Sequence, residues 1–303
     1  MRTEGGARRV VGPLVTTDWL AAHLGEPDLR VVDGSWHLPR LERDARKEWA
    51  EAHIPGALFF DIDEIADKRT SLPHMLPRPE EFGRAVGALG IGDGDRVVVY
   101  NTRAAVSAAR VWWTFRVFGH EPVAVLDGGL PKWRAEGRPV ESGVVSPAPR
   151  RFTPRLRAEL VRDLAAIRAN LASRREQVLD ARSRGRFLGR EPEPRPGLRG
   201  GHIPGSRNLP YDTLYRPDET LHSTDQLRRA LERAGIDLAR PVVTTCGSGV
   251  TASVLAFALH LVGCPETAVY DGSWSEWGGR EDTPVSTRPP RSASTRSRPT
   301  PTA

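Results

Sequence analysis

Residues 241–263, PVVTTCGSGVTASVLAFALHLVG, combine a strand, a loop and a helix in one run. PVVTT is typical of a buried strand, and TASVLAFALHLVG is typical of a helix that ends before Gly263. The loop between them places Cys246 at the carboxyl end of the strand, where open α/β sheets bind their ligands. The stretch therefore predicts a parallel sheet with a thiol at its ligand-binding edge.

This stretch is the third of four blocks that occur twice in the same order. The first set is VVDGSWHLP (31–39), HIPGALFFDID (53–63), RVVVYNTRAAVSAARVWWTFRVFG (96–119) and VAVLDGGLPKWRAEGRPV (123–140). The second set is QVLDARSRGRF (177–187), HIPGSRNLPYD (202–212), the stretch 241–263 and TAVYDGSWSEWGGREDTPV (267–285). Because the spacing between matching blocks is nearly constant, the chain is a duplicated domain.

Short apolar runs alternate with helical segments in both copies. Such alternation predicts α/β domains, each a parallel β-sheet flanked by helices on both faces. We expect an N-terminal domain at 12–140, a proline-rich linker at 141–157 and a C-terminal domain at 158–282. The stretch 283–303 is poor in apolar residues, so we expect a disordered tail there.

The bulk properties exclude several classes of protein. The net charge is +6, but four arginines and one acid near the end of the chain supply half of it, so we expect no nucleic-acid partner. No apolar run reaches the length of a membrane span, and the N-terminal apolar patch is too short for a signal peptide. We therefore expect a cytoplasmic protein that does not insert into membranes.

Cys246 and Cys264 are the chain's two cysteines. A helix over 251–262 would separate them by roughly 18 Å, whereas a disulfide needs Cα atoms within about 7 Å. Their spacing does not match a zinc site, and we expect neither a metal nor a cofactor. Most free cysteines are small buried hydrophobic residues. That interpretation suits Cys264, but a cysteine in a glycine-rich turn at a helix N-terminus favours a reactive thiolate.

The loop also excludes one reaction. Cysteine phosphatases use a Cys-x5-Arg loop whose arginine binds the phosphoryl group. Here the sixth residue after Cys246 is Ala252, and the loop contains no basic residue. A phosphatase is therefore disfavoured.

The loop CGSGVTA and its flanking blocks resemble the two-domain rhodanese family of sulfurtransferases, in particular its 3-mercaptopyruvate sulfurtransferase branch. The similarity extends over about residues 12–285. It implies two tandem rhodanese-like domains, of which only the second is catalytic and carries its sulfur as a persulfide on Cys246. In the first copy Asn101 occupies the position of the cysteine, which fits that asymmetry.

The resemblance also implies roles for individual residues. Ser248 would act with His74 and Asp63 in a Ser-His-Asp arrangement, although the latter two lie in the first copy. The arginines of GRFLGREPEPRPG (185–197) that match the family are Arg186 and Arg195, which would bind the substrate's carboxylate and carbonyl oxygens. The remaining substrate-binding positions are those of the loop: Gly247, Gly249, Val250 and Thr251.

The implied reaction moves sulfur from 3-mercaptopyruvate, releasing pyruvate, to a thiol acceptor such as thioredoxin, or to cyanide. Thiosulfate is the alternative donor, but thiosulfate-preferring relatives place basic side chains where this chain has Gly247 and Ser248. A non-catalytic binding or redox-sensing module is a further alternative, and loss of the cysteine would have supported it. The physiological acceptor, the oligomeric state and the role of the arginine-rich tail stay open.

Overall fold

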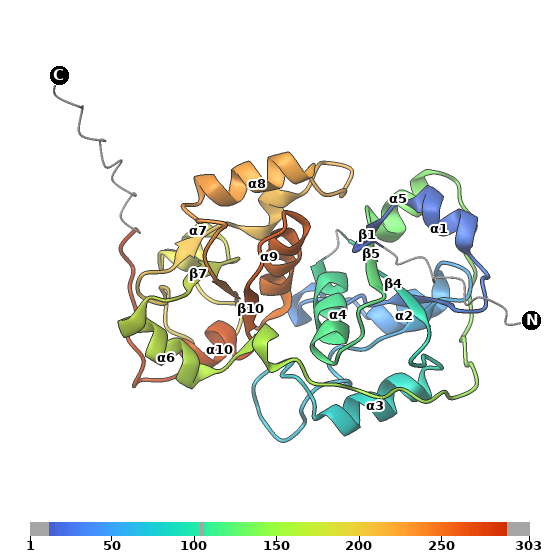
Figure 1. Cartoon of the computed structure of the whole chain (residues 1–303), viewed down its shortest axis with the longest axis horizontal. Coiled ribbons are helices and arrows are strands. Elements are labelled where there is room, and N and C mark those ends of the chain that lie inside the picture. Colours follow the sequence, from blue (N-terminus) through green and yellow to red (C-terminus); the bar gives the residue numbers. More distant parts are fainter. Residues whose placement is uncertain (1–11, 104–105, 290–303) are drawn as a thin grey trace, which may run out of the picture.

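The computed structural model describes residues 12–103 and 106–289. They form two α/β domains side by side, each built on a five-stranded sheet (Figure 1). The strand orders are β1-β5-β4-β2-β3 and β6-β10-β9-β7-β8, and the described strand pairs are parallel. The two tandem α/β domains predicted from the repeat are thus confirmed, and equivalent strands occupy equivalent places in the two sheets.

The N-terminal domain contains β1 (Leu14–Val15), α1 (Thr17–His23), β2 (Leu29–Asp33), α2 (Ala45–Glu51), β3 (Leu58–Phe59), α3 (Pro79–Ala88), β4 (Arg96–Tyr100), α4 (Val106–Val117), β5 (Val123–Leu126) and α5 (Gly129–Ala135). The C-terminal domain contains β6 (Val161–Arg162), α6 (Leu164–Ser173), β7 (Gln177–Asp180), α7 (Arg184–Phe187), β8 (Arg207–Asn208), α8 (Thr224–Arg233), β9 (Val242–Thr245), α9 (Val250–Leu261), β10 (Thr267–Tyr270) and α10 (Ser273–Trp277). Short 3₁₀ helices lie at Pro39–Leu41, Ala158–Leu160 and Tyr211–Leu214.

Helices cover both faces of each sheet, because successive strand residues point to opposite sides. Val97 and Val99 of β4 lie in a core with α3 and α4, whereas Val98 lies in a second core with α1 and α5. In the C-terminal domain Val242 packs with α8 and α9, and Val243 packs with α6 and α10. The near-continuous apolar strands of the sequence are therefore those of a sheet buried on both faces.

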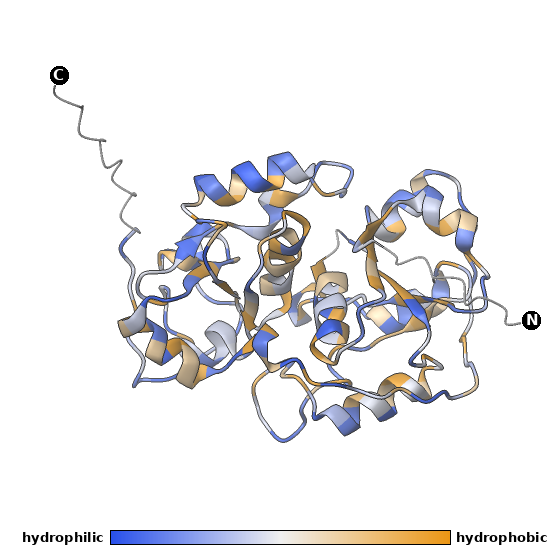
Figure 2. Cartoon of the chain, viewed as in Figure 1, coloured by the Kyte–Doolittle hydropathy of each residue, from blue (hydrophilic) through white to orange (hydrophobic). Residues whose placement is uncertain are grey.

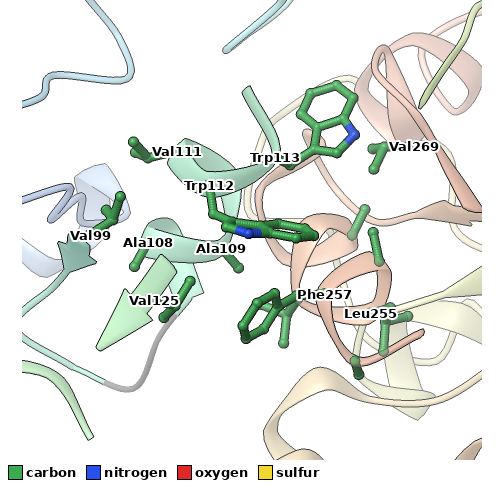
Figure 3. Packing of buried hydrophobic residues seen from close by; sticks show 14 of the residues in the cluster. Val99, Ala108, Ala109, Val111, Trp112, Trp113, Val125, Leu255, Phe257 and Val269 are labelled. Atoms are coloured by element: carbon green, nitrogen blue, oxygen red, sulfur yellow. The ribbon is translucent and has the colours of Figure 1, made fainter. Parts of the chain in front are cut away.

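The two domains meet through α4 and α9, which are equivalent helices of the repeat. Trp112 of α4 packs edge-on against Phe257 of α9, with ring centroids 4.7 Å apart (Figure 3). One continuous apolar cluster includes both helices. In Figure 2, α9 is mostly hydrophobic whereas the outer helix α8 is largely hydrophilic. Hydrophobic packing therefore holds the domains together.

The ends of the expected segments need one correction. The linker packs on the N-terminal domain, where Phe152 is buried and the amide of Arg150 donates to the carbonyl of Gly87 at 2.8 Å. We expected disorder from residue 283 onward, but Thr283 is buried and Ser286 pairs with His202 through two backbone hydrogen bonds. The C-terminal domain therefore extends to at least Ser286, because this segment closes over α10. The rest of the expected tail, 290–303, lies outside the described residues.

Across the described ranges, no helix is both long and apolar enough to cross a bilayer.

Candidate functional site

The loop that carries Cys246 is fixed from behind by the start of α10. The Cys246 carbonyl accepts from the Trp274 amide at 2.9 Å, and the Gly247 carbonyl accepts from the Ser275 amide at 2.8 Å. The Ser273 hydroxyl oxygen accepts from the Cys246 amide at 3.2 Å. These bonds hold the loop's backbone while its other side faces a cavity.

The first copy repeats this support without the chemistry. The Asn101 carbonyl accepts from the Leu130 amide at 3.1 Å, as the Cys246 carbonyl accepts from Trp274. Asn101 thus occupies the position of the cysteine, as the repeat predicts. The thiol is replaced there by an amide, which cannot form a persulfide.

Helix α9 begins beside the loop without a side-chain cap. Its N-cap residue is Gly249, whose φ is +80°. Other helices of the chain begin at capping side chains such as Asp163 and Ser223. The first amides of α9 are therefore open to an anion, which the helix dipole favours.

A cavity of about 700 Å³ lies between the domains, with Cys246 in its wall. Cys246 is only 2% exposed, so a donor must enter the cavity to reach it. The expected site residues in the wall, besides Cys246, are Arg186, Arg195, Gly247, Ser248, Val250 and Thr251. The N-terminal domain supplies the opposite wall, including Trp36, Arg40, Leu41, Asn101 and Arg103.

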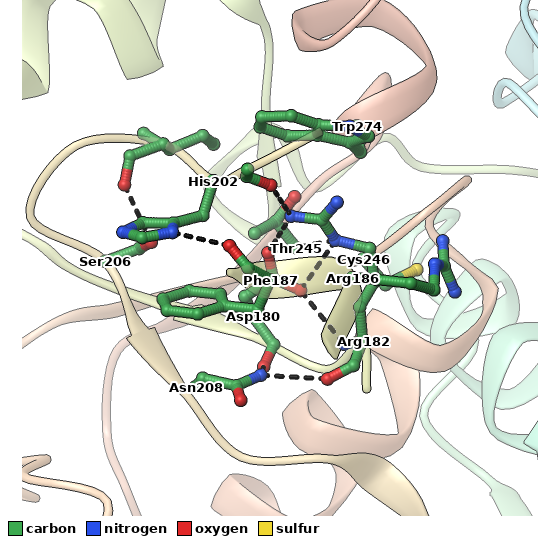
Figure 4. A network of polar contacts seen from close by, with 12 residues as sticks. Asp180, Arg182, Arg186, Phe187, His202, Ser206, Asn208, Thr245, Cys246 and Trp274 are labelled. Carbon is green, nitrogen blue, oxygen red and sulfur yellow. Dashed lines mark hydrogen bonds and ion pairs between the residues drawn. The ribbon is translucent and has the colours of Figure 1, made fainter. Parts of the chain in front are cut away.

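Arg186 is held by a network that the sequence did not reveal; Figure 4 shows the inner part of that network, Arg182 against Asp180. Glu193 accepts from Arg186 at 2.5 Å with one oxygen and from Arg182 at 2.7 Å with the other. Arg182 in turn pairs with Asp180 at the end of β7, at 2.6 Å. The side chain of Glu193 is 2% exposed, and two guanidinium groups face this buried carboxylate. The network fixes Arg186 beside the loop.

Glycine at position 247 leaves room for this placement of Arg186. A Cβ at residue 247 would lie 3.0 Å from Nη2 of Arg186. The absence of a side chain therefore lets a guanidinium group approach the loop backbone next to Cys246.

Asp63 and His74 are brought together, as the resemblance implied. Nδ1 of His74 lies 2.9 Å from Oδ1 of Asp63, and Trp36 Nε1 donates to the other oxygen at 2.7 Å. The hydrogen bond with His74 lowers the pKa of Asp63. Burial lowers the pKa of His74 below 6.5, although Asp63 partly opposes this. The imidazole is therefore neutral near pH 7 and oriented by a carboxylate.

The far side of this ring faces Arg195. Nη2 of Arg195 lies 3.3 Å from Nε2 of His74. Because a guanidinium group can only donate, Nε2 is the acceptor and the ring proton lies on Nδ1. Burial lowers the pKa of Arg195, and the neighbouring Cys246 acts in the opposite direction. Arg195 thus contacts His74 and lines the same cavity as Cys246.

Ser248 is not part of this chain of contacts. Its side chain lines the cavity and is nearly buried, but among the described hydrogen bonds none joins its hydroxyl to His74. The structure therefore assembles the Asp63–His74 pair and places Ser248 in the wall of the cavity, whose described lining includes Arg195 but neither Asp63 nor His74. The serine–histidine contact stays a prediction.

Four residues around the site were not anticipated: Trp36, Arg110, Glu193 and Asp271. The sequence showed that Asp271 is equivalent to Asp127 in the repeat, but it indicated no role for either aspartate. Glu193 lies in a proline-rich loop where a glutamate is ordinarily solvated. Within the described residues, no three His, Cys, Asp or Glu side chains gather as a metal site.

Comparison with known proteins shows the same architecture. The model of the rhodanese-like domain matches residues 16–136 and 163–280. The human 3-mercaptopyruvate sulfurtransferase is 45% identical over 270 residues, covering 87% of this chain and 91% of the relative. The thiosulfate sulfurtransferase of Rattus norvegicus is also 45% identical, over 271 residues, with the same coverage. Overall identity therefore does not separate the two donors.

A solved structure agrees. The crystal structure of SseA from Escherichia coli, described as a 3-mercaptopyruvate sulfotransferase, superposes with a TM-score of 0.81 at 36% identity. It covers 87% of this chain and 99% of its own.

Proposed function

Because the chain belongs to the rhodanese family of sulfurtransferases, we propose that it moves a sulfane sulfur from 3-mercaptopyruvate to a thiol or to cyanide through a persulfide on Cys246. The observation that carries this is Cys246 in the wall of a cavity between the domains, which Arg186 and Arg195 also line. An α-keto acid presents two adjacent oxygen-bearing groups that guanidinium forks fit.

The reaction has two halves. The Cys246 thiolate attacks the donor's sulfur, the carbon–sulfur bond breaks, and its electron pair leaves as the enolate of pyruvate. Arg186 and Arg195 stabilise the enolate's negative oxygen. The proton of the donor's thiol, taken up through Ser248 or by Nε2 of the neutral His74 and returned to the enolate carbon, completes pyruvate. In the second half a thiolate or cyanide attacks the outer sulfur, and the thiolate of Cys246 leaves. The uncapped amides at the start of α9 favour the negative charge on the Cys246 thiolate and on the persulfide.

The composition of the loop supports 3-mercaptopyruvate over thiosulfate. Thiosulfate is a compact dianion, and Gly247 and Ser248 offer it no charge next to the cysteine. A Cβ at Gly247 would also lie 3.0 Å from Nη2 of Arg186, so a side chain there would displace that guanidinium group.

The size of the cavity supports an acceptor larger than the donor. A volume of about 700 Å³ suits drug-sized ligands, whereas 3-mercaptopyruvate has only a few non-hydrogen atoms. The outer wall carries Arg40, Leu41 and Arg103, a mixed apolar and cationic rim. Such a rim fits a thiol on a larger molecule, such as thioredoxin. Thiols of this kind prevail in reducing compartments, and we propose the cytoplasm as the location.

One assay tests the proposal. Thiocyanate formation from cyanide is followed with 3-mercaptopyruvate and with thiosulfate, for the wild type and for Cys246→Ser. The matched control is Cys264→Ser, because Cys264 is buried outside the cavity. We expect turnover in the wild type and in the control but not in Cys246→Ser. Absence of turnover with both donors would refute the proposed sulfurtransferase activity. A higher kcat/KM with thiosulfate would show that thiosulfate, and not 3-mercaptopyruvate, is the preferred donor.

A further inference from the structure

A buried ion pair joins the two domains beneath the cysteine loop. Nη2 of Arg110, on α4, donates to Oδ1 of Asp271 at 2.7 Å. The two side chains are 3% and 5% exposed. Asp271 directly follows β10, so the pair connects the N-terminal domain to the neighbour of β9, the strand that precedes Cys246.

Both partners also bind the segment that carries His74. Nη2 of Arg110 donates to the carbonyl of His74 at 2.5 Å, and Oδ2 of Asp271 accepts from the amide of Leu76 at 2.8 Å. The φ of His74 is +60°, in the left-handed region that side chains other than glycine rarely adopt. The pair therefore anchors the backbone directly after a histidine in a strained conformation.

The same guanidinium group lies against the cysteine loop. A Cβ at Gly249 would lie 2.7 Å from Nη1 of Arg110 and 3.2 Å from the carbonyl oxygen of Asp271. Arg110 thus contacts the loop and the His74 segment at once.

The repeat offers an internal comparison, because its copies are offset by 145 residues up to α4 and α9 and by 144 at the aspartates that follow β5 and β10. Asp127, the counterpart of Asp271, accepts from the amide of Leu221, the counterpart of Leu76, at 2.9 Å. Glu219, at the position of His74, has a φ of +64°. Leu255, however, stands at the position of Arg110.

Some of these contacts occur on both sides of the domain interface, whereas the arginine occurs on one side. The aspartate–amide contact and the left-handed residue occur on both sides of the interface, so the fold forms them without an arginine. The arginine occurs on the side that holds Cys246 and His74, whereas the other side has Asn101 and Glu219. A buried ion pair is also a weak source of net stability, because desolvation offsets the attraction.

We propose that Arg110 and Asp271 are positioning residues that hold His74 in place over the cysteine loop and so couple docking of the two domains to sulfur transfer. This inference rests on the proposed function. The charged groups that face His74 are Asp63, Arg195 and Arg110. Asp63 and Arg195 contact the two ring nitrogens and so determine which of them carries the proton. Arg110 holds the backbone carbonyl of His74.

The test compares Arg110→Lys in the wild type and in a His74→Gln background. Lysine keeps the charge but cannot contact Asp271 and the His74 carbonyl through one planar fork. We expect single-turnover release of pyruvate from 3-mercaptopyruvate to slow about tenfold or more, since small misplacements cost such factors. In the His74→Gln background the same change should have no further effect. The matched control is Arg116→Lys, on the same helix at the domain interface but bonded to His260, which should stay within about twofold.

NMR titration of His74, assigned by His74→Gln, gives a readout that does not need turnover. We expect Arg110→Lys to move the pKa of His74 toward 6.5, because the loosened segment admits water. An inactive wild type would refute the proposed function, and the titration would still decide the inference. An unchanged titration and rate, or an equal loss of rate in both backgrounds, would overturn it. If Arg110→Lys does not fold, Asp271→Asn carries the same test; failure of both to fold would make the pair structural and also overturn the inference.

Discussion

Replacing Gly249 by alanine should damage the protein far more than the same change at the other end of α9. Gly249 and Gly263 have φ values of +80° and +79°, so alanine costs about 1–2 kcal/mol of conformational energy at either position. At Gly263 a Cβ would meet nothing within 4 Å, whereas at Gly249 it would lie 2.7 Å from Arg110. That guanidinium group is ion-paired and buried, so the clash should add roughly 1–3 kcal/mol.

The pair of variants therefore isolates the clash. Alanine also restricts the unfolded chain, which returns about 0.4–1 kcal/mol, but it does so equally in both variants. Urea unfolding should show Gly249→Ala to be roughly 1–3 kcal/mol less stable than Gly263→Ala. We also expect Gly249→Ala to lose at least about tenfold in kcat/KM with 3-mercaptopyruvate, while Gly263→Ala keeps its activity. Equal stability losses, within about 0.5 kcal/mol, would refute the close contact between Arg110 and the loop.

Three further predictions follow from the polar groups. Glu193→Gln leaves Arg186 without its carboxylate, so steady-state kinetics should show the KM for 3-mercaptopyruvate rising about tenfold; an unchanged KM would contradict the positioning network. Asp63→Asn removes the anion that raises the pKa of His74, so the acid limb of kcat/KM should move to lower pH, and an upward move would count against a neutral catalytic imidazole. Burial raises the pKa of Asp33 to about 6 from 3.8, so stability falls as pH rises through that window; Asp33→Asn should therefore stabilise the protein at pH 7.5 by up to roughly 3 kcal/mol, with no gain below pH 3.8 in thermal unfolding.

The repeat was enough to predict the two domains, because strand and helix alternation is a local property. The repeat also aligned Asn101 with Cys246, and the equivalent backbone contacts of the two residues confirm that match. The C-terminal boundary was misplaced because residues 283–286 contribute few apolar side chains. Their attachment depends on backbone pairing with His202 and on the buried hydroxyl of Thr283, which composition does not reveal.

The site was less accessible to sequence reasoning. Asp63 and His74 lie far from Cys246 in the chain, and only the family resemblance connected them before the domains were seen together. Glu193 is buried because Arg182 and Arg186 converge on it, and convergence is a property of three dimensions. Electrostatic partners across the domain interface could not be inferred from spacing within either copy.

The contact between α4 and α9 has a consequence for how such an enzyme can arise. Two unfused copies of one ancestral domain, joined through this helix, would form a homodimer with a two-fold axis and two identical catalytic centres. Every mutation in that dimer would appear in both centres, so neither could specialise. Fusion of the copies into one chain removes this constraint. One centre can then give up its nucleophile, and its residues become free to serve the neighbouring centre.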